Sequence, residues 1–184
     1  GLREGKGTSF EGGHRVPCII RWPGVVPSGV VTDRLASTLD ILPTLVAFTG
    51  ASLPSKKIDG VDITSILKGD RQANPRRTFY YYYRQNSLEA VRKDHWKLVL
   101  PHSGRTYEGF LPGNDGHPGP APETYQFGQA LYDLRRDPGE RYDVQNQYPE
   151  KLKELQALAE EARQELGDDI VKREGSSRRP IGRL

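Results

Sequence analysis

The sequence predicts a mixed fold, α/β over residues 1–77 and α+β in a C-terminal unit whose small antiparallel sheet packs on one long helix. Three observations predict it. A glycine-rich loop leads into a β-branched run near the start, short strand patterns follow one another after residue 77, and leucines recur at helical spacing near the end. We therefore divide the chain into residues 1–77, residues 78–168, and a basic tail over 169–184 that is expected to be flexible.

The first predicted element is a buried strand from Arg15 to Trp22, which follows the glycine-rich start of the chain. Branched apolar residues suit a sheet, and Pro23-Gly24 ends the run. Cys18 lies inside it, so we expect its thiol to be in the core. As the only cysteine, it excludes an internal disulfide and any multi-cysteine metal site.

Two helices are predicted next. The run Ser37-Thr38-Leu39-Asp40 offers side-chain oxygens for capping ahead of an apolar face over residues 41–48, with Pro43 in the first turn. Gly50 supplies the end of this helix, because glycine readily takes the left-handed conformation. A shorter helix is expected over residues 63–68.

The C-terminal unit is predicted from strand patterns and one helix. The patterns lie at residues 79–83, 88–92, 96–100 and 130–134. A long loop over residues 101–126 separates the last two of them and is either functional or mobile. Alternation along Phe79–Tyr83 sends successive rings to opposite faces, so we expect these aromatic side chains to be core. Pro149 is well placed to begin the helix, which runs to Leu166.

Charge and hydropathy exclude several classes of partner. The formal net charge is +3, and basic and acidic residues are interspersed until positive charge concentrates over residues 171–180. Such a tail is more typical of a frayed end than of a nucleic-acid contact. No apolar run approaches the roughly 20 residues that cross a bilayer. We expect no nucleic-acid partner and no membrane span.

The chemistry in the first segment centres on Lys6, which stands between Gly5 and Gly7. A lysine without bulky neighbours can project its ammonium while the flanking backbone approaches a ligand closely. A point charge and exposed N–H groups suit a tetrahedral oxyanion such as sulfate or phosphate. A lysine between glycines is also typical of a flexible surface turn, and composition alone leaves both interpretations open.

The segment Leu2–Pro17 resembles a run found in sulfatases of the arylsulfatase and N-acetylgalactosamine-6-sulfatase type, Leu-Arg-x-Gly-Lys-Gly-Thr-x-x-Glu-Gly-Gly-x-Arg-x-Pro. Further matches lie at residues 21–24, 35–45, 59–62, 131–134 and 137–140. The similarity covers most of residues 1–166. The chain therefore resembles the C-terminal portion of that family: the end of an alkaline-phosphatase-like α/β domain, followed by a smaller sheet-plus-helix unit.

The resemblance implies a catalytic role for Lys6. It matches the family lysine that contacts the sulfate of an aryl sulfate or sulfated sugar and stabilises the leaving group. Within the same segment, Glu11 and Arg15 are expected to form a buried pair that fixes the loop.

The resemblance also implies two groups whose residues this chain lacks. Sulfatases act through a formylglycine made in a Cys/Ser-x-Pro-x-Arg segment, and they bind calcium through several aspartates and an asparagine. Cys18 is followed by Ile-Ile-Arg and does not fit. We therefore expect no metal ligands here, a missing N-terminal portion of the same protein as partner, and no activity from this piece alone.

Two residues at the start of the long loop are candidate substrate-binding groups besides Lys6. His102 and Arg105 lie beside the end of a predicted strand, where an imidazole and a guanidinium would contact a sulfated substrate. The alternative is a loop anchored by its own hydrogen bonds.

Two other functions remain open from the sequence. One is hydrolysis of phosphate or phosphonate esters on the same scaffold. The other is a noncatalytic module that binds anionic polysaccharide through Lys6, Arg105 and the basic tail. The family resemblance suggests a periplasmic, secreted or lysosomal location.

Overall fold

The computed structural model describes residues 1–111, 113–117 and 119–178, and the chain divides into two compact units. Residues 17–77 form one unit, and residues 1–16 cluster with the chain from Thr78 onward in the other. The segment that carries Lys6 therefore packs with the C-terminal unit. The grouping of residues 1–77 into one large domain stays a prediction. No helix in the described part of the chain is long and apolar enough to cross a membrane.

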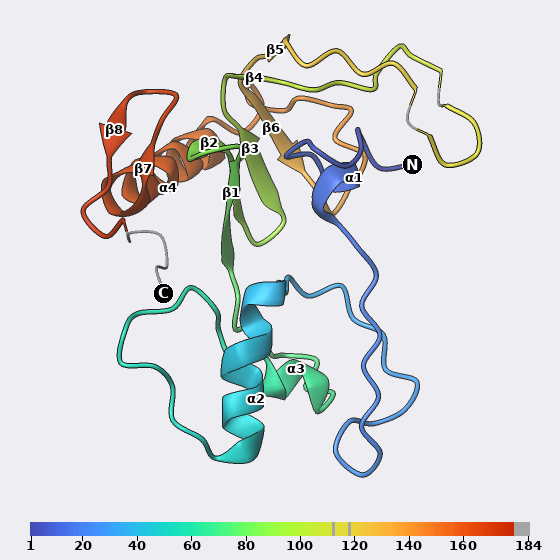
Figure 1. Ribbon diagram of the computed structural model, residues 1–184, viewed down its shortest axis with the longest axis vertical. Helices are drawn as coiled ribbons and strands as arrows, with labels where there is room; N and C mark the ends of the chain where they lie inside the picture. The colour runs from blue at the N-terminus through green and yellow to red at the C-terminus, as the bar shows by residue number, and fades with distance from the viewer. Residues whose placement is uncertain (112, 118, 179–184) are drawn as a thin grey trace. The chain divides into compact units, whose positions relative to one another are not determined.

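The unit over residues 17–77 contains the two expected helices (Figure 1). A 3-10 turn, Thr38–Asp40, leads directly into α2, Ile41–Thr49, and α3 spans Thr64–Leu67. Ser37 and Asp40 form a reciprocal capping box at the start, and Gly50 ends α2 in the left-handed conformation with φ of 69°. Both predicted helices are confirmed.

The buried strand expected over Arg15–Trp22 is wrong. The segment is extended but forms no strand, and Val16 and Ile19 are 72% and 94% exposed. The physical reason is that residues 17–77, all of which are described, contain no other strand whose backbone could pair with it. Cys18 is accordingly exposed rather than a core thiol.

The C-terminal unit is built on a four-stranded antiparallel sheet. Its strands are β1 (Thr78–Tyr83), β2 (Ser87–Lys93), β3 (Trp96–Val99) and β6 (Ala130–Asp133), in the order β1-β2-β3-β6. All four strands were predicted from the sequence. The register pairs Arg92 with Lys97 and Lys97 with Tyr132, so these three side chains form a row across one face.

The two faces of the sheet have separate cores. On one face, the sheet packs against α4, Pro149–Leu166, through a cluster that includes Leu88, Leu98 and Leu155. The other face packs beneath the first residues of the chain, where Phe10 joins Tyr81 and Val99. The rings of β1 alternate between these cores, as the sequence predicted: those of residues 80 and 82 lie on the helix side, and those of residues 79 and 81 lie on the other.

A β-bulge interrupts the pairing of β1 with β2. Tyr81 pairs with Ala90 and Tyr82 with Leu88, so Glu89 is the extra residue. A bulge turns a side chain that would otherwise follow the alternation of the strand. Here it leaves Glu89 buried and bonded to Ser9 of the first segment.

Short ladders complete the unit. The ends of the long loop pair as β4, His102–Gly104, with β5, Tyr125–Phe127. After α4, β7 (Gly167–Asp168) pairs with β8 (Arg173–Glu174), and only β8 lies inside the region expected to be a flexible tail. Residues 179–184, the end of that predicted tail, lie outside the described residues.

Candidate functional site

The lysine segment, defined here as residues 1–16, carries an exposed lysine on a closely packed backbone. Its only helix is α1, Glu11–His14, which begins five residues after Lys6. Gly7 has a φ of 96°, which side-chain-bearing residues rarely adopt. A Cβ at Gly12 would lie 2.2 Å from the Glu4 carbonyl oxygen, and one at Gly13 would lie 2.2 Å from that of Thr8. These glycines are required because backbone passes directly against backbone.

The Lys6 side chain points into open space. It is exposed, and among the described residues it has no hydrogen bond or ion pair. Its backbone carbonyl, in contrast, accepts a hydrogen bond of 2.8 Å from the hydroxyl of Tyr107. The ammonium is therefore available to a ligand, while the main chain from which it extends is held.

The start of the long loop is hydrogen-bonded to the lysine segment. The Glu4 carboxylate accepts from the Tyr107 N–H at 2.6 Å and from the Thr106 hydroxyl at 2.7 Å. Arg105 donates to the Tyr107 hydroxyl at 3.2 Å, and its guanidinium lies 3.3 Å from where a Cβ of Gly7 would stand. The structure thus brings Arg105 and Lys6 into one neighbourhood. Arg105 is also paired with Glu123 near the other end of the loop.

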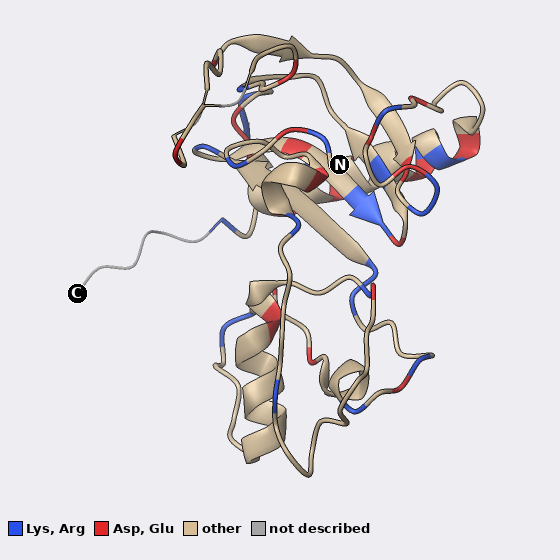
Figure 2. Ribbon diagram, turned by 90° about the vertical axis from the view of Figure 1, so that its right-hand side faces the viewer, with Lys and Arg blue, Asp and Glu red and all other residues tan. Residues whose placement is uncertain are grey.

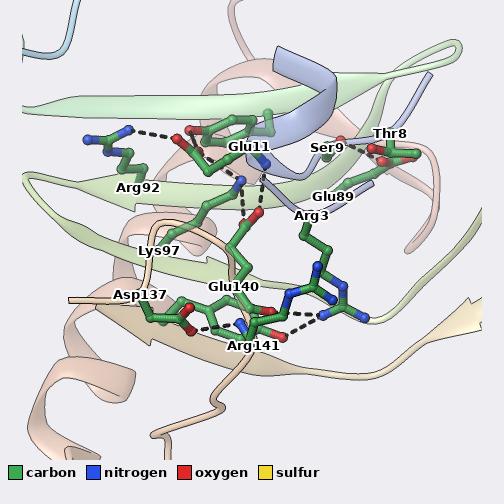
Figure 3. Close-up of polar contacts among 12 residues, drawn as sticks. Arg3, Thr8, Ser9, Glu11, Glu89, Arg92, Lys97, Asp137, Glu140 and Arg141 are labelled. Carbon is green, nitrogen blue, oxygen red and sulfur yellow. Dashed lines mark hydrogen bonds and ion pairs between the residues drawn. The ribbon is translucent and has the colours of Figure 1, made fainter. Parts of the chain in front are cut away.

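A buried cluster of charges lies beneath α1 (Figure 3). Lys97, fully buried on β3, places its ammonium 3.2 Å from Glu11 Oε1 and 2.8 Å from Glu140 Oε1. Glu140 Oε2 accepts the backbone N–H of Glu11 at 2.6 Å, and Arg92 lies 3.6 Å from Glu11. The expected Glu11–Arg15 pair is therefore wrong. Arg15 is exposed, because the end of α1 carries it away from the sheet that supplies the partners of Glu11.

The cluster shifts the pKa values of its members in opposite directions. Burial alone would raise the pKa of Glu11, but Lys97 and Arg92 outweigh it and hold that pKa below its ordinary value. Burial raises the pKa of Glu140 despite the nearby Lys97. Burial disfavours the ammonium of Lys97, yet the phenol of Tyr81 and the two carboxylates raise its pKa on balance. Lys97 is therefore a charged, structural lysine.

The candidate His102 lies in a different environment. Its ring is buried and stacks on Phe127 with centroids 5.0 Å apart. One ring nitrogen, Nδ1, contacts the Leu100 carbonyl at 2.7 Å, and Nε2 lies 3.4 Å from Glu89. Glu89 in turn accepts a hydrogen bond of 2.5 Å from Ser9. A cavity of about 450 Å³ opens beside His102 and Glu89.

The described residues do not fit the metal and nucleophile that the resemblance implies. No group of three or more His, Cys, Asp or Glu side chains in this part of the chain is arranged to hold a metal ion. Exposed Cys18 is followed by Ile19 and Ile20 rather than by the formylglycine segment.

Charges of both signs are interspersed along the ribbon, as the sequence indicated (Figure 2).

Sequence reasoning missed the contact of Glu4 with Tyr107, and it missed Lys97 and Glu140 as partners of the lysine segment. Only Glu140 had a signal, because the Asp137–Glu140 turn was among the matched segments. Lys97 reads as a polar residue alternating with apolar ones along a strand, which predicts exposure. Its carboxylate partners lie 86 and 43 residues away in the sequence, and only the fold brings them together.

Comparison with known proteins supplies the family. The description "C-terminal region of aryl-sulfatase" matches residues 74–182, more than half of the chain, and "N-sulphoglucosamine sulphohydrolase, C-terminal" matches residues 5–102. Arylsulfatase A of Bos taurus is 39% identical over 162 residues, which are 85% of this chain and 31% of that protein. N-acetylgalactosamine-6-sulfatase of Mus musculus is 33% identical over 175 residues, 88% of this chain and 33% of that protein.

A solved structure supports the same assignment. The structure of BT4656 in complex with its substrate D-glucosamine-2-N,6-O-disulfate matches this chain with a TM-score of 0.54 and 26% identity. The match covers 79% of this chain and 27% of that one. The chain spans about a third of the length of the curated relatives. With its antiparallel sheet, its long C-terminal helix and its lysine segment, the chain belongs to the sulfatase family and corresponds to the C-terminal portion of its members.

Proposed function

We propose that the protein to which this chain belongs hydrolyses sulfate esters, and that Lys6 is the catalytic residue this portion contributes. One observation carries the proposal: the Lys6 ammonium is exposed and unpaired among the described residues, on a backbone held by Tyr107. A positive charge at a fixed position neutralises a sulfate group and stabilises the leaving oxygen as the sulfur–oxygen bond breaks. Lysine needs no deprotonation for this task.

Arg105 is the second proposed substrate contact. Its guanidinium lies beside Gly7, which supports a contact with the same anion or with an adjoining part of the substrate. The proposed substrate is an aryl sulfate or a sulfated sugar, since one similar protein binds a disulfated glucosamine. A substrate contact by His102 stays a prediction, because both of its ring nitrogens face protein partners.

Calcium and formylglycine belong to the proposal only as groups of the whole protein. A formylglycine would supply the nucleophile, and calcium would supply positive charge near the sulfate group. The described residues offer no site for either, so their chemistry is assigned outside them. We further propose that residues 1–77 complete a large alkaline-phosphatase-like domain. The 184-residue chain alone is then expected to give no turnover, and measurable hydrolysis of an aryl sulfate by it would contradict this assignment.

The test replaces Lys6 in the full-length protein. Lys6→Ala is expected to lower kcat on an aryl sulfate by about 10²- to 10³-fold, as loss of one electrostatic contact to the reacting group does. Because the side chain is exposed, the melting temperature should not change. Lys153→Ala, at an exposed lysine of α4, is the matched control and should leave kcat unchanged.

An aryl phosphate assayed in parallel separates the two ester classes. Faster turnover of the phosphate than of the sulfate would favour the phosphatase alternative. Near-normal kcat in Lys6→Ala would contradict the catalytic role of Lys6 and would show that the segment is a glycine-rich turn without one.

A further inference from the structure

We propose that Lys97 is a positioning residue for Lys6: its buried ammonium, held between Glu11 and Glu140, fixes the lysine segment on the sheet. This inference rests on the proposed role of Lys6. Lys97 itself is fully buried. It acts through the backbone of the segment that carries Lys6.

The lysine segment needs anchors because it has little regular structure of its own. Its one helix has four residues, and a helix that short is not stable by itself. Gly7, Gly12 and Gly13 add no side-chain packing. Since the Lys6 side chain makes no bond among the described residues, the place of its ammonium follows from where the backbone is held.

Three sets of polar contacts hold that backbone, and the Lys97 cluster is the one in which buried charges of opposite sign meet. Glu4 reaches the partly exposed start of the long loop, and Ser9 donates to Glu89 at the bulge. Glu11, in contrast, is attached twice at one point, through its side chain to Lys97 and through its N–H to Glu140. Charge pairs away from water are screened least, and Lys97 lies on a strand paired on both sides.

The cluster also ties the lysine segment to the turn that follows β6. Glu140 sits in the turn after β6 with a φ of 52°, a conformation that L side chains rarely adopt. Its carbonyl accepts from Arg3 at 3.3 Å, so the turn contacts the lysine segment on both sides of Lys6. A shift of this turn would therefore be passed directly to the segment.

The central variant is Lys97→Met in the full-length protein. Removing the ammonium leaves Glu140 facing Glu11 in the same buried space, with the Arg92 guanidinium, 3.6 Å from Glu11, as a remaining cation. Both carboxylates then lose the cation between them, and their repulsion, or the proton uptake that relieves it, weakens the attachment of α1 to the sheet. A displacement of about 1 Å at a catalytic group lowers turnover by about 10²-fold. We expect the loss in kcat on an aryl sulfate, with KM changed by less.

Loss of stability must be separated from loss of position. Leu155→Ala removes a buried side chain on the opposite face of the sheet and should lower the melting temperature comparably, but it leaves the lysine segment in place. Assayed below both melting temperatures, Leu155→Ala should keep kcat while Lys97→Met loses it. Lys93→Met makes the same chemical change at a partly exposed lysine that pairs with Glu154 of α4, and it should leave kcat unchanged. Equal kcat losses in Lys97→Met and Leu155→Ala would overturn the proposal.

A second measurement does not depend on activity. Amide hydrogen exchange reports the bonds from the Glu11 N–H to Glu140 and from the Gly12 N–H to Arg3. Both amides should exchange at least about tenfold faster in Lys97→Met, with the amides of β3 unchanged. Glu140→Gln, a milder change that keeps the shape, should give a smaller effect in the same direction if Lys97→Met does not fold.

The outcomes of these experiments distinguish the two proposals. Unchanged exchange at Glu11 and Gly12 would overturn the anchoring by Lys97, whatever the activity. Faster exchange together with normal turnover in Lys6→Ala would support the anchor while contradicting the catalytic role of Lys6. Faster exchange and reduced kcat in Lys97→Met, with Lys6→Ala also impaired, would support both.

Discussion

Adding one methyl group at Gly12 should disable the lysine segment. An alanine Cβ there would lie 2.2 Å from the Glu4 carbonyl oxygen and 2.3 Å from that of Arg3, whereas ordinary contacts begin at 3.4 Å. The backbone at Arg3 and Glu4 must therefore move by about 1 Å, since backbone atoms cannot rotate aside as a side chain does. The 2.8 Å hydrogen bond from Gly12 N–H to the Arg3 carbonyl is strained by the same movement.

The magnitude follows from these contacts. Overpacking costs about 1–3 kcal/mol and the weakened hydrogen bond about 1 kcal/mol, so Gly12→Ala should lower the unfolding free energy by about 2–4 kcal/mol. Because Lys6 follows Glu4 by two residues, kcat on an aryl sulfate should fall by about 10²-fold. Thermal unfolding and steady-state kinetics of the full-length protein measure both quantities. Gly128→Ala is the control, since a Cβ there meets nothing within 4 Å. A Gly12→Ala protein as stable and active as this control would refute the reasoning.

Two further predictions concern the two faces of the sheet. The pKa of Glu11 is lowered on folding, so its contribution to stability is present above the ordinary value of 4.5 and is lost as pH falls below it. Urea unfolding between about pH 3 and 6 should show this loss, and Glu11→Gln should flatten the curve; an equally steep curve in that variant would contradict the assignment. On the helix face, Leu155→Ala should cost about 2–5 kcal/mol of unfolding free energy, and Leu152→Ala, at a partly buried site of the same helix, clearly less. Equal costs would show that burial does not set the energetics of α4.

The helices and strands of this chain were predictable where local pattern and tertiary packing agree. The leucines of α4 recur at helical spacing because one face of the helix lies on the sheet. The capping residue Ser37 and the glycine after α2 also act locally, through contacts within a few residues. The rings of β1 alternate because a strand does.

The partners of Glu11 were not predictable in the same way. The nearest basic residue of the segment, Arg15, was the natural choice from sequence, but α1 turns it outward. Lys97 became the partner because the register of β3 against β2 and β6 places it in a row beneath α1. The bulge at Glu89 is equally hidden, since nothing in the composition of β2 indicates an extra residue. Local patterns thus predicted the elements, while long-range contacts determined the site.

The chain leaves the C-terminal unit after Val16 and returns to it at Thr78. Residues 17–77 form a compact unit of their own, and a flexible loop within it costs only about 0.6 kcal/mol more for each doubling of its length. Insertions or deletions between these points should therefore disturb the docked lysine segment little, provided that its end contacts remain.

Contacts between distant residues also form slowly, and Glu11 and Glu140 are 129 residues apart. The hairpins of β1, β2 and β3 are expected to form first. The segment that carries Lys6 is expected to pack afterwards on the completed sheet.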